Sequence, residues 1–164
     1  MSDREYFLKV IDIELPRFER VFKAMPKDKL DYTSHPKNRT ARQIATGMLF
    51  NGPGMVQILQ NGVVDFSKPS GEPPKFENGD EAAEIFKKGM QELKTEAKKI
   101  SDKDWDGTAE LLAPDPKMNW KSTKRDMCWE FLHDLIHHRG QLTMYLRPMG
   151  GKVPSTYGPS GDPA

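Results

Sequence analysis

The stretch HDLIHHRGQLTMYLR, residues 133–147, combines three of the chain's four histidines with apolar residues at helical spacing. Each residue of an α-helix turns the side chain by about 100°, so His138 can serve as a zero mark for its neighbours. On that scale a set of apolar side chains falls between about −20° and +60°. These side chains are Met127, Phe131, Leu135, Leu142 and Tyr145. The pattern predicts an amphipathic helix that begins at a cap on Ser122 or Thr123 and stops near Pro148.

Two segments nearer the N-terminus have the same helical spacing. The first runs from about Asp3 to Ala24 and is expected to bend at Pro16, since proline removes one backbone hydrogen bond and crowds the preceding turn. The second runs from about Thr40 to Gln60 and contains NGPG at residues 51–54. We expect this tetrapeptide to kink or split the second helix.

A further helix follows the cap signal at Asn78 and runs from about Gly79 to Ile100. Residues 101–122 then favour a short turn of helix and an irregular crossover. The chain after Gly150 lacks a helical period, and almost no alternating strand pattern occurs anywhere. The expected fold is a single all-α domain over residues 1–164, a four-helix bundle with long connectors and an irregular C-terminal tail.

The composition excludes several classes of partner. The 25 Lys and Arg residues nearly balance the 24 Asp and Glu residues, so no strong field attracts nucleic acid or anionic lipid. No segment approaches the roughly 20 apolar residues of a membrane span, and we expect a soluble cytoplasmic protein. The single cysteine, Cys128, lies between Met127 and Trp129 and is expected to be packed in the interior. A metal site would therefore use His, Asp, Glu or amide ligands.

The helical phase separates the three clustered histidines. Asp134 falls at about −40° and Gln141 at about −60° from His138, so a carboxylate is expected beside that imidazole on the buried side. His133 and His137 come out near −140° and −100° and are expected to face solvent or a polar rim. Asp134 and His138 form either half of a divalent metal site or a closed ion pair that needs no metal.

The run HRGQL followed by YLR and a glycine, together with RTARQIATGMLF at residues 39–50, resembles the DinB-like family of four-helix proteins. The resemblance covers most of the chain. It implies a relation to bacillithiol- and mycothiol-dependent S-transferases and to a mycothiol-dependent maleylpyruvate isomerase. In those enzymes a divalent metal held by three histidines activates a thiol or water. The resemblance also implies a homodimer, with Trp129 placed either in its interface or in the core.

The resemblance also assigns positions to the family's metal ligands. The histidine before R-G-Q is His138, and the one four residues earlier is replaced by Asp134, which can still bind a hard or borderline cation. The histidine of the second helix falls on Gly47, which has no ligand atom. Gln43 and Asn51 stand one turn on either side and would have to supply an amide oxygen, a poor ligand for zinc. The implied metal site is therefore degenerate.

Three functions follow as alternatives. The first is a transferase or hydrolase-like enzyme that acts on a small molecule or thiol through Zn, Ni or Mn on Asp134 and His138. The second is a binding module without metal, whose pocket opens at Gly47 opposite His138 and is lined by Gln43, Asn51 and Gln141. The third is a structural homodimer. No nucleotide or flavin is expected, because no G-x-G-x-x-G or P-loop motif is present.

The C-terminal run VPSTYGPSG, residues 153–161, has prolines and glycines typical of a fixed extended segment. Tyr157 is expected to anchor it by packing its ring while its hydroxyl finds a partner. The segment either caps the end of the bundle or closes the mouth of a pocket.

Overall fold

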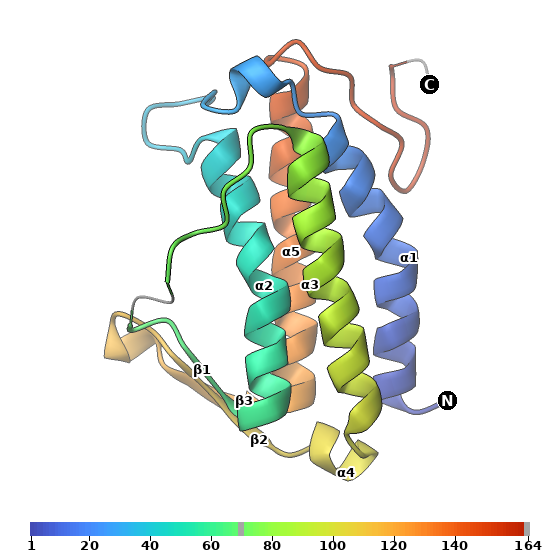
Figure 1. Cartoon of the computed structure of the whole chain (residues 1–164), viewed down its shortest axis with the longest axis vertical. Helices are drawn as coiled ribbons and strands as arrows, with labels where there is room; N and C mark the ends of the chain where they lie inside the picture. The colour runs from blue at the N-terminus through green and yellow to red at the C-terminus, as the bar shows by residue number, and fades with distance from the viewer. Residues whose placement is uncertain (69–70, 163–164) are drawn as a thin grey trace.

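The computed structural model describes residues 1–68 and 71–162, and long helices dominate it (Figure 1). The helices that lie side by side are α1 Asp3–Lys23, α2 Ala41–Asn61, α3 Gly79–Lys99 and α5 Lys124–Leu146. Their bounds lie close to the predicted ones. A short helix, α4 Asp102–Trp105, confirms the expected turn after α3. None of the described helices has the length and apolar character needed to cross a lipid bilayer.

Local sequence signals explain where the long helices begin. The side chains of Ser2, Thr40, Asn78 and Thr123 each accept a hydrogen bond from a backbone N–H in the first turn of α1, α2, α3 and α5. Such caps satisfy backbone donors that have no partner within the helix. The caps predicted at Asn78 and Thr123 are thereby confirmed.

The expectation of a purely all-α fold is wrong, because three short strands form a sheet beside α2 and α5 (Figure 1). The strands are β1 Val63–Asp65, β2 Thr108–Leu112 and β3 Trp120–Thr123. The β1 and β2 strands run parallel, with Val64 opposite Leu111, and β2 and β3 run antiparallel. Strands of three to five residues are too short to show a clear alternating pattern, and β1 pairs with a strand that is distant in sequence.

Of the kink or split expected at NGPG, the split does not occur, because α2 runs unbroken through Pro53. The reason lies in the packing against α3. A Cβ on Gly52 would lie 3.1 Å from the carbonyl carbon of Gly89, and a Cβ on Gly89 would lie 3.3 Å from Cδ of Pro53. The two glycines let the backbones approach closely, so tertiary packing supports the helix through the proline.

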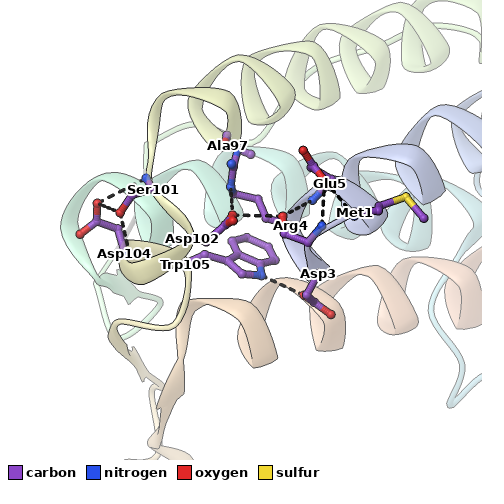
Figure 2. A network of polar contacts seen from close by, with 10 residues as sticks. Met1, Asp3, Arg4, Glu5, Ala97, Ser101, Asp102, Asp104 and Trp105 are labelled. Carbon is purple, nitrogen blue, oxygen red and sulfur yellow. Dashed lines mark hydrogen bonds and ion pairs between the residues drawn. The ribbon is translucent and has the colours of Figure 1, made fainter.

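Side chains at the N-terminus of α1 form hydrogen bonds with α4 and with the end of α3 (Figure 2). Arg4 donates to the Asp102 carboxylate at 2.8 Å and to the Ala97 carbonyl at 2.9 Å. The Asp3 carboxylate accepts hydrogen bonds from the indole nitrogens of Trp105 at 2.8 Å and Trp129 at 3.1 Å. The Trp129 ring is thus tied into this end of the bundle.

Candidate functional site between helices α2 and α5

A chain of polar side chains joins α2 to α5. The Asn51 amide donates to Asp134 Oδ2 at 3.1 Å, and Asp134 Oδ1 lies 3.4 Å from His138 Nε2. His138 Nδ1 donates to the Gln141 amide oxygen at 2.7 Å, and the Gln141 amide nitrogen donates to His137 Nε2 at 3.0 Å. Four of the predicted site residues, Asn51, Asp134, His138 and Gln141, are therefore brought together.

The burial of the Asp134–His138 pair differs from the prediction. The His138 side chain is 18% exposed, but the Asp134 side chain is 50% exposed and does not lie on the buried side. The predicted stripe omitted several side chains that are buried, at about +80° to +120° from His138. These are Cys128, Leu132, Arg139 and Leu146. They move the centre of the buried face to about +50°, which leaves Asp134 about 90° away.

His133 and His137 are exposed, as predicted. The nearest carboxylate to His133 is that of Glu130, 3.9 Å from its Nδ1. His35, the fourth histidine, lies in the loop before α2 and accepts a hydrogen bond from the Lys37 backbone N–H at 3.1 Å.

The residues present do not fit a tight metal centre. In residues 1–68 and 71–162, no three His, Cys, Asp or Glu side chains gather closely enough to hold an ion together. Gln43 does not join the Asp134–His138 pair, because its amide oxygen instead accepts the Thr40 N–H at 2.9 Å and so caps α2. Two ligands on one helix are fewer than the three or four of protein zinc sites.

The side chain of Arg39 lies next to Gly47. A Cβ on Gly47 would lie 3.7 Å from Arg39 Nη1, which belongs to the exposed loop before α2. The guanidinium therefore lies near the position from which the resemblance expects a metal-binding histidine to project. A permanent positive charge at this point opposes the binding of a metal cation.

A pocket of about 420 Å³ opens between this loop and α5, and we call it the His138 pocket. Its lining is Lys37, Asn38, Arg39, Ile44, His138, Gln141, Met144 and Tyr145. The Tyr145 hydroxyl donates to the Arg39 carbonyl at 3.1 Å and so holds the loop against α5. No lining residue is acidic, and within the described ranges neither Lys37 nor Arg39 has a carboxylate partner within 4.0 Å. The pocket is therefore electropositive.

Cys128 is buried and does not belong to this site. Burial raises the pKa of its thiol, although the charge of Lys124 acts in the opposite direction. The thiolate is the nucleophilic form, so Cys128 is a packing residue, as predicted.

A buried ion pair lies on the other side of α5 and was not predicted. Arg139 is 3% exposed and Glu14 of α1 is 5% exposed, and Arg139 donates to the Glu14 carboxylate at 2.6 Å. Arg17 donates to the same carboxylate. Burial opposes ionisation of Glu14, but the hydrogen bonds and charge of Arg139, with hydrogen bonds from Arg17 and Tyr157, hold its pKa below the usual value. A period of apolar residues could not reveal this pair, because both members are charged.

Tyr157 joins this ion pair to the C-terminal tail, which lies beside α1 in Figure 1. Its hydroxyl accepts from Arg139 at 2.6 Å and donates to Glu14 at 3.1 Å, which confirms that the hydroxyl finds a partner. Arg20 of α1 also donates to the Ser155 carbonyl at 3.1 Å. The tail therefore lies over α1 and not over the mouth of the His138 pocket, whose lining contains no tail residue.

Comparison with known proteins decides the family. The model of the DinB family matches residues 1–162. The chain belongs to the DinB family. This confirms the resemblance in the HRGQL run and in residues 39–50.

Two solved DinB-like proteins have a similar fold. One, from Bacillus subtilis, is 15% identical with a TM-score of 0.71, and the match covers 94% of this chain and 99% of that one. The other, from Bacillus cereus, is 18% identical with a TM-score of 0.74 and coverages of 93% and 97%. At these identities the likeness concerns the fold alone. A comparison with curated protein sequences gives no match.

Proposed function

We propose that this DinB-family protein binds a small organic anion in the His138 pocket, with Arg39 providing the charge that a metal provides in the enzymes the sequence resembles. The observation that carries the proposal is the Arg39 guanidinium beside Gly47. Lys37 adds a second cation to the pocket lining. Guanidinium groups bind carboxylates and phosphates through paired hydrogen bonds.

The pocket also suits the uncharged part of such a ligand. Its volume of about 420 Å³ lies within the range of small-molecule sites. Ile44, Met144 and the Tyr145 ring give it apolar surface, and Gln141 and Asn38 supply amide groups. A carboxylate or phosphate attached to a compact apolar group uses all of these features.

Isothermal titration with benzoate, and separately with inorganic phosphate, tests the proposal. Saturable binding of at least one anion is expected. Arg39→Gln should weaken it about 10- to 100-fold, because a hydrogen bond to a charged group contributes about 1.5–3 kcal/mol. Lys98→Gln, which removes an exposed charge on α3, should leave the affinity unchanged. Binding of neither anion, or equal loss in both variants, would contradict the proposal.

The metal-dependent enzyme is the competing function, and the Asp134–His138 pair favours it. Elemental analysis before and after chelation, with thermal shifts on adding Zn, Ni or Mn, separates the two. Stoichiometric metal that is lost in Asp134→Ala and His138→Ala but kept when His133 and His137 are replaced would establish the metal site. The homodimer and the cytoplasmic location stay predictions, and sedimentation velocity measures the first.

A further inference from the structure

A second cleft lies beside Asp134, where the sheet meets α2 and α5. Its volume is about 290 Å³. The lining comes from five separate segments of the chain and comprises Asn51, Phe66, Leu111, Trp120, Glu130, Phe131 and Asp134. We call it the aromatic cleft. None of its lining residues belongs to the His138 pocket.

Aromatic rings form two of its walls. Phe66 stacks on Phe131 with ring centroids 6.2 Å apart and an interplanar angle of 28°. Gly54 makes room for this arrangement, since a Cβ there would lie 3.2 Å from Cε1 of Phe131. The Phe66 backbone N–H donates to the Leu112 carbonyl at 2.8 Å, so the sheet fixes the position of the ring. Phe66 is nevertheless 37% exposed, and Trp120 of β3 is half-buried.

The charge of the cleft is negative. Glu130 and Asp134 lie one turn apart on α5, a spacing at which like charges repel. No lining residue is basic. Throughout the described part of the chain, no Lys or Arg nitrogen lies within 4.0 Å of either carboxylate. Their neighbours within that distance are uncharged or weakly basic: His133 lies 3.9 Å from Glu130, His138 lies 3.4 Å from Asp134, and the Asn51 amide donates to Asp134 at 3.1 Å.

Two carboxylates beside partly exposed aromatic rings are complementary to an organic cation. The face of an aromatic ring attracts an ammonium group, most strongly when the ring is that of Trp. A divalent metal ion would not use the aromatic walls, since it requires several oxygen or nitrogen ligands. A neutral apolar ligand would desolvate the carboxylates without pairing them. The combination therefore selects a ligand with both positive charge and methyl or methylene surface.

We propose that the aromatic cleft binds a small alkylammonium ion, with its cationic group against Trp120 and Phe66 and its charge paired by Asp134 and Glu130. This site is separate from the proposed anion site. Such a ligand would pair the two carboxylates, which have no Lys or Arg partner in the described structure. It would also contact the exposed ring of Phe66, which packs against the Phe131 ring in the space that Gly54 leaves.

Titration with choline and with its uncharged isostere 3,3-dimethylbutan-1-ol tests the proposal. Choline is expected to bind at one site per chain, and the isostere at least tenfold more weakly. Asp134→Asn, which keeps the shape of the side chain, and Trp120→Leu should each weaken choline binding at least fivefold. Glu84→Gln, which removes an exposed carboxylate of α3, should have no effect. Thermal unfolding of each variant shows that it is folded.

Two results would overturn the proposal. One is equal affinity for choline and the neutral isostere, which would make the cleft a simple apolar recess. The other is no choline binding by the wild-type chain. Arg39→Gln should leave choline binding intact and Trp120→Leu should leave benzoate binding intact, so failure at one site is distinguishable from failure at the other.

Discussion

Replacing Arg139 by methionine should lower the free energy of unfolding by about 3 kcal/mol, because it removes the buried partner of the Glu14 carboxylate and leaves Arg17 and the Tyr157 hydroxyl as donors to it. Both residues are at most 5% exposed, so water cannot replace the lost hydrogen bond at 2.6 Å. The Arg139 guanidinium also packs over the Phe18 ring, 4.5 Å from its centroid. Urea denaturation of wild type and variant measures the change.

A double variant separates the effect of the charge left on Glu14 from the effect of the packing that Arg139 loses. Combining Glu14→Leu with Arg139→Met removes both charges and fills the space with apolar side chains. We expect the double variant to be more stable than Arg139→Met alone, since an apolar pair often substitutes for a buried ion pair at little cost. A double variant as unstable as the sum of the two single variants would show that the charges are not coupled.

The Glu14 carboxyl should also make stability depend on pH in the acid range. Its pKa is lower in the folded chain than the ordinary value of about 4.3, so the unfolded chain binds a proton more readily. Its contribution is complete above that ordinary pKa and is lost as the pH falls through the lower, folded-state pKa. The stability difference between wild type and Glu14→Gln should therefore shrink between about pH 5 and pH 3. Denaturation curves across this range measure it, and a constant difference would contradict the assignment.

The helices could be predicted because their signals are local. A cap such as Asn78 and an apolar period over 20 residues need no knowledge of the rest of the chain. The sheet depends on pairs such as Val64 with Leu111, which only the folded chain brings together. The aromatic cleft was missed for the same reason, since Leu111 and Trp120 belong to that sheet and Phe66 directly follows its first strand.

The candidate site was located in sequence, but the predicted centre of the buried face was wrong by about 30° around the helix axis. His138 and Asp134 are neighbours, as predicted, but the charged Arg139 is buried more deeply than His138. A charged residue does not count toward an apolar stripe, although a buried partner such as Glu14 can hold it in the core. The proximity of Arg39 to Gly47 was equally hidden, because only the folded loop brings its guanidinium there.

Substituting Gly79 by alanine should have the second large effect, a loss of about 3 kcal/mol in the free energy of unfolding. A Cβ on Gly79 would lie 2.0 Å from the carbonyl oxygen of Phe22 and 2.9 Å from its carbonyl carbon. Both are backbone atoms of α1, so no side-chain rotation relieves the clash. The start of α3 has to move away from the end of α1, which opens the core around Phe22 and Phe86.

Gly140→Ala is the matched control for Gly79→Ala, since it makes the same chemical change in another long helix. Gly140 is exposed in α5, and nothing lies within 4 Å of a Cβ built there. Alanine should therefore stabilise the chain by about 0.5–1 kcal/mol, because it restricts the unfolded backbone without a clash. Thermal unfolding should move in opposite directions for the two variants, by about 2–4 °C per kcal/mol. If both raised the midpoint, α1 and α3 would not meet at Gly79, and the close contact between these two helices would have to lie elsewhere.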